Sequence, residues 1–139
     1  MKFVFDRCVA RAHARALNEY DKDNILVALD DDPRFKPTSK DVDIIEILSS
    51  EKPKPVFVTS DLNMKTKHPH ERKALAGSGL TLVFLTKGFN SVEILVAARR
   101  LYQVWPKTVS AVKKCKSPTV FDVKLKGEAL RNCGLTKDL

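Results

Sequence analysis

Residues 56–61 read Val-Phe-Val-Thr-Ser-Asp, a short apolar run that ends in two hydroxyl side chains and an acid. The same arrangement occurs twice earlier in the chain: residues 2–5 are followed by Asp6, and residues 25–29 by Asp30. Apolar runs this short have the length of buried strands. We therefore predict three strands, each with an acid at its carboxyl end.

Helical patterns lie between these runs. In residues 7–20 the apolar side chains recur at helical spacing with arginines on the other face, and the stripe comprises Val9, Ala12, Ala16, Leu17 and Tyr20. Thr38 and Asp41 resemble a capping box that starts a helix running to about Ser50. The prolines at 53 and 55 end it.

The rest of the chain continues the alternation. The expected elements are a helix from Pro69 to about Gly77, a strand at 80–85, a helix at 91–104 that stops near Pro106, a shorter helix at 107–116 and a strand at 119–123. Alternating strands and helices with short connections predict an α/β fold, a three-layer α/β/α domain with a mostly parallel central sheet.

Charge is divided unevenly along the 139 residues, whose net charge is +8. Residues 1–63 hold 10 basic and 12 acidic side chains, and residues 64–139 hold 15 basic and 5 acidic. A uniformly basic surface would indicate simple binding to phosphates. The acids of the first half therefore need their own explanation.

Several other classes of protein are excluded. The apolar runs are too short for a membrane-spanning helix, and the acid at position 6 comes too early for a signal peptide. The three cysteines are odd in number and far apart, so neither a disulfide framework nor a zinc site is expected. Reduced cysteines without an export signal predict a cytoplasmic protein without a membrane partner.

The acids at the strand ends predict a metal site. The carboxyl ends of parallel strands meet at one edge of a sheet, so Asp6, Asp30 and Asp61 are expected there. Asp41 shares a helical face with the residues that pack on the sheet and points to the same edge, whereas Asp43 lies on the solvent side. Clustered carboxylates repel one another unless a cation neutralises them, and hard oxygen ligands select Mg²⁺ or Mn²⁺. Helix caps and solvated turns remain alternatives for each acid.

The order of several short motifs resembles the PIN-like nuclease domain, in particular the small toxins of VapC type. The matching segments are Phe5-Asp6, Asp41-Val42-Asp43-Ile44-Ile45, Val58-Thr59-Ser60-Asp61, Glu71-Arg72-Lys73-Ala74-Leu75 and Gly79-Leu80. Trp105 and residues 118–121 are similar to the family's last helix and strand. The resemblance covers residues 1–126 as a PIN-like domain and leaves 127–139 as a C-terminal tail.

The resemblance implies an Mg²⁺- or Mn²⁺-dependent endoribonuclease that hydrolyses phosphodiester bonds. It assigns Asp6, Asp41 and Asp61 as catalytic metal ligands, with Thr59 or Ser60 bonding a carboxylate or metal-bound water. Asn63 stands where a fourth acid is common in the family, and Asp43 or Asp30 could replace it. Toxin relatives are usually held by an antitoxin, so a protein partner is implied, and a homodimer stays open.

Basic residues follow the third acidic strand end directly. Among them, Lys65, Lys67, Arg72 and Lys73 are candidates for contacts with RNA phosphates beside the metal site. A solvated loop and helix face is the alternative for each of them.

Two other functions are weighed against the nuclease. A phosphoacceptor domain similar to bacterial receivers would use Asp30, Asp31, Asp61, Thr86 and Lys87. It fits poorly, because receivers carry their acid pair after the first strand, where only Asp6 stands. The second alternative is a catalytically inactive PIN-like module. It would bind nucleic acid or protein through its basic half.

Overall fold

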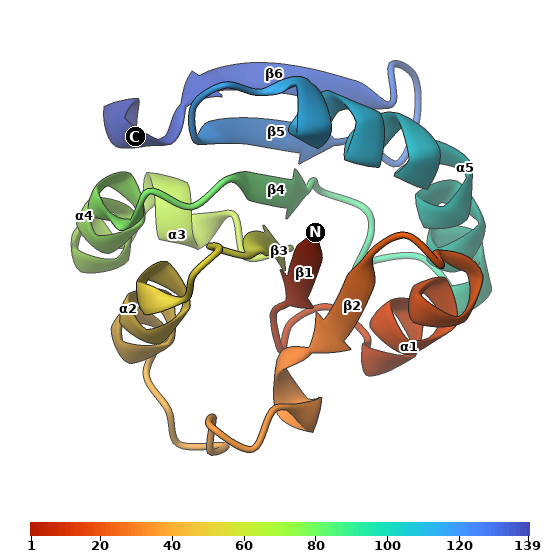
Figure 1. Ribbon diagram of the computed structural model, residues 1–139. Helices are drawn as coiled ribbons and strands as arrows, with labels where there is room; N and C mark the ends of the chain where they lie inside the picture. The colour runs from red at the N-terminus through yellow and green to blue at the C-terminus, as the bar shows by residue number, and fades with distance from the viewer.

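The computed structural model describes all residues from 1 to 139, and its strands and helices alternate along the chain (Figure 1). The strands are β1 (Lys2–Phe5), β2 (Ile25–Ala28), β3 (Val56–Thr59), β4 (Leu82–Leu85), β5 (Thr119–Val123) and β6 (Leu130–Leu135). The helices are α1 (Arg11–Tyr20), α2 (Asp41–Ser50), α3 (Asn63–Thr66), α4 (Pro69–Ser78) and α5 (Ile94–Lys114), with 3₁₀ turns at Leu29–Asp31 and Thr136–Asp138.

The six strands form one sheet in the order β2-β1-β3-β4-β5-β6. Strands β1 to β5 are parallel to their neighbours, and only β6 is antiparallel. The chain first moves from β1 outward to β2 and then crosses to β3 on the other side of β1. In open parallel sheets, ligands bind beside such a reversal, at the carboxyl ends of the strands. A ligand site is therefore expected at the residues that follow β1 and β3.

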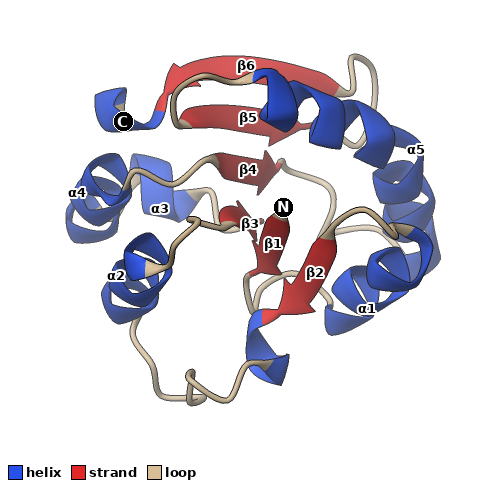
Figure 2. Cartoon of the chain, in the orientation of Figure 1, coloured by secondary structure: helices blue, strands red, loops and turns tan.

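Helices cover both faces of the sheet, as Figures 1 and 2 show. On one face α1 and α5 bury Leu17, Leu101 and Trp105 in a cluster with Phe3. On the other face, helices α2 and α4 contribute to a second cluster that contains Ile44, Leu48, Leu75 and, from the sheet, Val4. Neighbouring residues of β1 enter opposite clusters because side chains alternate along a strand. The predicted three-layer α/β/α fold is confirmed.

Helix α5 departs from the prediction of two helices separated at Pro106. It runs without interruption from Ile94 to Lys114, with Pro106 inside it on the exposed side. A proline costs the helix one hydrogen bond, but the apolar stripe continues across it from Leu101 through Trp105 to Val112. Burial of this stripe outweighs the local cost. None of the helices combines the length and apolar character that a membrane crossing requires.

Two elements differ from their sequence patterns in burial. Strand β2 reads as a continuous apolar run, yet it is the edge strand, and Ile25 is 60% exposed. Helix α1 starts at Arg11 rather than at residue 7, and Tyr20 of its expected apolar stripe is exposed, where it packs edge-on against Tyr102. His13 is buried instead, and burial lowers its pKa, as befits a packed histidine.

The segment expected as a tail contributes the sixth strand. Leu130–Leu135 pairs antiparallel with β5, and the hydroxyl of Thr136 donates a hydrogen bond of 2.7 Å to the carbonyl of Leu80. That hydroxyl belongs to a fully buried residue. The last residues are therefore anchored at the amino end of β4, away from the edge where Asp6 lies.

Candidate functional site

Asp6 follows β1 directly and is held against β3. Its backbone N–H donates to the carbonyl of Val58 at 2.8 Å, which extends the strand ladder by one residue. One carboxylate oxygen accepts a hydrogen bond of 2.8 Å from the N–H of Arg7, and the other accepts one of 2.7 Å from the hydroxyl of Thr59. With 6% of its surface exposed, Asp6 is a buried carboxylate of fixed orientation.

Thr59, the last residue of β3, connects the carboxylate of Asp6 to the segment that carries Asp61. Its side chain is fully buried, and its hydroxyl oxygen accepts a hydrogen bond of 3.1 Å from the N–H of Asp61. The carboxylate of Asp61 accepts one of 3.0 Å from the N–H of Asn63, where α3 begins. Thr59 thus hydrogen-bonds the carboxylate of Asp6, while its predicted part in a metal site stays a prediction.

Cys8 and Ser60 tie the two strand ends together behind these acids. The sulfur of Cys8 lies 3.4 Å from an oxygen of Asp6 and accepts a hydrogen bond of 3.3 Å from the N–H of Ser60. Burial and the charge of Asp6 raise the pKa of the Cys8 thiol, which stays protonated at neutral pH. The Ser60 hydroxyl donates to the carbonyl of Cys8 at 3.2 Å and accepts from Asn90 at 2.9 Å, so it contacts no carboxylate.

Asp41 is the first residue of α2 and is half-buried. The pKa of its carboxyl is raised, first by burial and then by the negative charges of Asp6, Glu71 and Asp61, while the charge of Arg7 acts in the opposite direction. Asp6 and Asp61 therefore both lie within electrostatic reach of Asp41, although the three acids come from three different parts of the chain. Side-chain capping plays no part here, because Lys40 is the N-cap and the expected capping box of Thr38 and Asp41 does not form.

Glu71 is a fourth acid of this group that the sequence reasoning missed. It lies in the first turn of α4, and its carboxylate forms an ion pair with His68. Helices α2 and α4 both begin at the carboxyl edge of the sheet, so their first-turn acids lie on the same side. Glu71 stood in one of the motifs quoted above. The fourth acid was expected close to Asn63 in the sequence, whereas Glu71 comes from the following helix α4.

Arg7 holds the segment that leads into α2. Its guanidinium donates to the carbonyls of Lys36, Pro37 and Ser39 at 3.2, 2.8 and 2.6 Å. Each carbonyl gains a charge-assisted hydrogen bond, so one side chain fixes the loop immediately before Asp41. Because Arg7 follows Asp6 in the chain, its hydrogen bonds connect the end of β1 to the segment before Asp41.

Asp30 and Asp43, the two expected substitutes for a fourth acid, are placed differently. Asp30 is exposed and pairs with Arg11 at 3.4 Å, and its neighbour Asp31 is held by Arg15 at 2.7 Å. Asp43 is exposed on α2. Neither Asp30 nor Asp43 is among the charges that raise the pKa of Asp41.

Of the four basic residues predicted to contact RNA, one forms an ion pair within the chain and three form none. The ammonium group of Lys65 lies 2.7 Å from the carboxylate of Asp122 and 4.5 Å from the centre of the Phe84 ring. Lys67, Arg72 and Lys73 are exposed and form no ion pair with the protein. Contacts of Lys65 with an outside phosphate would first require it to leave Asp122.

The donor set suits a hard divalent cation by its chemistry. Asp6, Asp41, Asp61 and Glu71 offer carboxylate oxygens only, the ligands that Mg²⁺ and Mn²⁺ prefer. Burial and then the charges of the other three acids raise the pKa of Asp41, and a bound cation would offset both effects. No three acidic, histidine or cysteine side chains stand at the spacing of a ready-made metal cage. Binding of Mg²⁺ or Mn²⁺ would therefore draw the carboxylates together.

A family model described as a PIN like domain matches residues 1–87 of the chain. The matched span contains all four acids of the group, Asp6, Asp41, Asp61 and Glu71. Comparison with curated proteins and with solved structures found no match.

Proposed function

Because the chain belongs to the PIN-like domain family, whose members are generally nucleases, we propose that it is a metal-dependent endoribonuclease and the toxin of a toxin–antitoxin module. The observation that carries the enzymatic part is the position of Asp6, Asp41 and Asp61 at the carboxyl edge of the sheet, where the hydroxyl of Thr59 links Asp6 to Asp61. Burial first, and then the charges of Asp6, Glu71 and Asp61, raise the pKa of Asp41 there. A cation bound among these acids would offset the repulsion between their charges.

The four acids would hold Mg²⁺ or Mn²⁺, and three of them are positioned by different contacts within the chain. When bound, the ion supplies an activated water and neutralises charge on the phosphate and the leaving oxygen. Asp6 is oriented before binding by Thr59, and Asp41 is positioned through the loop that Arg7 holds. Asp61 is fixed by its own backbone turn with Asn63.

The toxin assignment rests on the likeness to VapC-type proteins and on the charge of the chain. Residues 64–139 carry most of the excess positive charge, and an acidic antitoxin segment would be attracted to it. A homodimer is part of the same proposal. Neither partner is needed for the metal-dependent cleavage itself, so the enzymatic claim is tested on the isolated chain.

Cleavage of a labelled RNA with and without Mn²⁺ tests the proposal. The variants Asp6→Asn, Asp61→Asn and Glu71→Gln keep the shape of each side chain and remove its charge. We expect each to lose at least about 1.4 kcal/mol of transition-state stabilisation, a tenfold loss in rate. Asp43→Asn is the matched control on the exposed side of α2 and should cleave like the wild type. Full activity in Asp6→Asn and Asp61→Asn would refute the nuclease.

Thermal unfolding separates an enzyme from an inactive binding module. A cation that binds the native chain must raise its unfolding temperature as its concentration rises. We expect Mn²⁺ to stabilise the wild type and Asp43→Asn, and to stabilise Asp6→Asn less. The absence of any shift at saturating Mn²⁺ would favour a PIN-like module without metal chemistry.

A further inference from the structure

A surface hollow is lined by Asp61, one of the group of acids. It has a volume of about 410 Å³, and its lining includes Cys8, Ser60, Asp61, Lys87, Asn90 and Ser91. A second hollow of about 440 Å³ continues on the far side of Lys87 and is lined there by Lys124, Leu125 and Lys126. Thr86, Lys87 and Gly88 line both hollows, so the two lie next to each other on either side of this loop, and together they are called the path below.

The path follows the carboxyl edge of the sheet. Asp61 comes after β3, Lys87 after β4 and Lys124 after β5, and these three strands are parallel neighbours. Neighbouring strands lie about 4.8 Å apart, so the path spans about 10 Å from the first to the third strand end. A single phosphate group cannot reach across it, whereas a polymer with repeated phosphates can.

Hydrogen bonds and close packing hold the two loops that line the path. The N–H of Thr86 donates to the carbonyl of Val123 at 2.9 Å, which ties the loop after β4 to the end of β5. Gly88 has a φ of 111°, and a Cβ atom there would stand 3.0 Å from the side chain of Leu125. Arg100 donates to the carbonyls of Lys124 at 2.9 Å and Gly127 at 2.7 Å, so the loop after β5 is anchored to α5.

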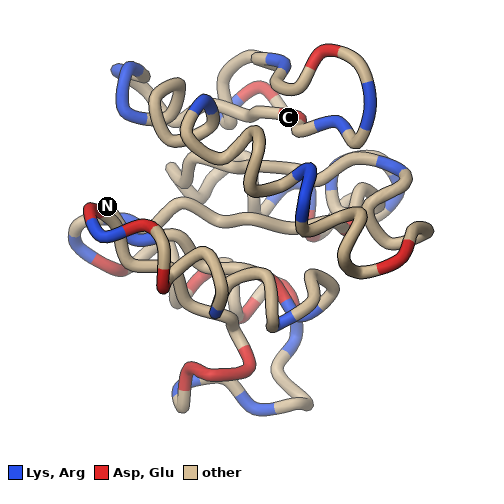
Figure 3. The backbone as a smooth tube through the Cα atoms, turned by 90° about the vertical axis from the view of Figure 1, so that its right-hand side faces the viewer, with Lys and Arg blue, Asp and Glu red and all other residues tan.

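The ammonium groups along this path are free. Lys87 and Lys126 are exposed, Lys124 is half-buried, and none of the three forms an ion pair or a side-chain hydrogen bond within the chain. Lys65, in contrast, is bound to Asp122. Glu128 lies on the same loop as an exposed acid. In Figure 3 the connection between β5 and β6 lies at the top with its basic segments, far from the acid-rich loop after β2 at the bottom.

We propose that the backbone of a single RNA strand lies along this path, with its phosphates on Lys87, Lys124 and Lys126 and the bond to be cut beside Asp61. The proposal rests on the nuclease function above and names the surface that holds its substrate. RNA is favoured over an acidic protein because the lysines lead directly to the carboxylates that would do the chemistry. Contacts of this kind position a strand without reading its bases.

Salt-dependent binding of a labelled, unstructured RNA in EDTA tests the path without interference from cleavage. Each phosphate contact of a single strand adds about 0.7 to the slope of log affinity against log salt. We expect Lys124→Ala/Lys126→Ala to reduce the slope by about 1.4 and to weaken binding at low salt. Lys114→Ala/Lys116→Ala is the matched control, because these exposed lysines have the same spacing and precede β5 at the opposite edge.

The outcomes separate this path from the nuclease itself. A reduced slope in the first double variant and an unchanged one in the control would support the path. Equal slopes in both, with Mn²⁺-dependent cleavage intact, would overturn the path and leave the nuclease standing. A wild type that neither binds nor cleaves RNA would overturn both. Circular dichroism of the two double variants checks that each is folded.

Discussion

The hydroxyl of Thr59 donates a hydrogen bond of 2.7 Å to the carboxylate of Asp6, 53 residues earlier in the chain. The same oxygen accepts the N–H of Asp61 at 3.1 Å. An N–H can only donate, so the hydroxyl oxygen accepts from Asp61 while its proton is directed to Asp6. Two of the proposed metal ligands are thus coupled through a single buried side chain.

Thr59→Val should uncouple these two acids. Valine keeps the volume of threonine, but the buried oxygen of Asp6 and the N–H of Asp61 each lose a partner. We expect a loss of about 1–3 kcal/mol in the free energy of unfolding, measured in urea, and a smaller stabilisation by Mn²⁺.

Thr108→Val provides the control for that experiment. Its hydroxyl is equally buried and donates to the carbonyl of Val104 within α5, far from the acids. We expect some loss of stability there too, but an unchanged response to Mn²⁺ and unchanged cleavage of RNA. Wild-type metal response in Thr59→Val would show that the link between the two acids has no functional role.

Asp41→Asn should stabilise the chain in the absence of metal while weakening metal binding. The pKa of Asp41 is raised on folding, so the folded chain holds this proton more tightly than the unfolded chain. Ionisation of Asp41 therefore costs stability, from just above its ordinary pKa of 3.8 up to neutral pH. Asparagine removes that cost.

Thermal melts of Asp41→Asn in EDTA across a range of pH check this expectation. At neutral pH the variant should melt a few degrees higher at most than the wild type, and the difference should vanish below the ordinary pKa of the carboxyl. With Mn²⁺ the order should reverse, because the variant lacks a ligand. Asp43→Asn, exposed on the same helix, should follow the wild type in both conditions. Destabilisation of Asp41→Asn in EDTA at neutral pH would contradict the proposed repulsion.

Arg7→Lys should loosen the segment before α2 although the charge is retained. A lysine ammonium cannot reproduce the planar set of donors that meets the carbonyls of Lys36, Pro37 and Ser39. We expect faster amide hydrogen exchange in residues 36–44 and about tenfold slower cleavage, since Asp41 is no longer held in place. Arg15→Lys is the control, because Arg15 pairs with Asp31 on the exposed side. Unchanged exchange in the Arg7 variant would exclude this positioning role.

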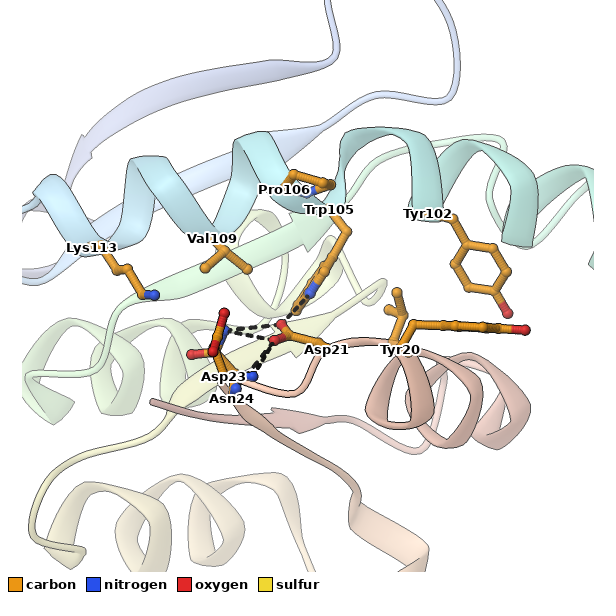
Figure 4. A pocket seen from close by; sticks show the side chains of 10 residues that line it. Tyr20, Asp21, Asp23, Asn24, Tyr102, Trp105, Pro106, Val109 and Lys113 are labelled. Carbon is orange, nitrogen blue, oxygen red and sulfur yellow. Dashed lines mark hydrogen bonds between the residues drawn. The ribbon is translucent and has the colours of Figure 1, made fainter.

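Asp21 forms a separate polar contact at the amino end of β2, away from the acids. Its carboxylate accepts hydrogen bonds from the indole N–H of Trp105 at 3.0 Å and from the amide of Asn24 at 2.9 Å (Figure 4). Burial acts to raise the pKa of Asp21, but the bonds from Trp105 and Asn24 outweigh it and hold the pKa below its usual value. The pocket beside this contact has a volume of about 530 Å³.

Asp21→Ala should therefore destabilise the chain at neutral pH. The indole N–H loses its acceptor, and we expect a cost of about 1–3 kcal/mol in the free energy of unfolding. The pKa is depressed on folding, so this contribution is fully present above 3.8 and disappears as the pH falls through the lower folded value. Urea melts followed by the fluorescence of Trp105, the single tryptophan, measure it. Asp23→Ala, an exposed neighbour, should show neither effect.

The order of strands and helices could be predicted because each element is marked locally. Pro69 begins α4 as expected, and the helix ends within two residues of the expected Gly77, at Gly79 in the left-handed conformation with a φ of 67°. The helix end predicted at Pro106 was wrong because tertiary packing, and not the local sequence, decides whether this helix continues. A proline alone favours the end of a helix. The apolar side of α5, however, packs against strands that come from distant segments of the chain, and the local sequence does not reveal this packing.

The candidate site was predictable only in part for the same physical reason. Asp6, Asp41 and Asp61 stand at strand ends and a helix start, positions that a parallel sheet necessarily brings to one edge, so the sequence alone points to them. Glu71 lies near Asp41 because α4 packs beside α2. Asp30 is not part of the group, because it pairs with Arg11 of α1. The free lysines after β4 and β5 likewise gain a role only from the sheet order. Local pattern determined which elements form and where their acids stand, and the tertiary structure decided which charges meet, since electrostatic interactions depend on distance in space rather than along the chain.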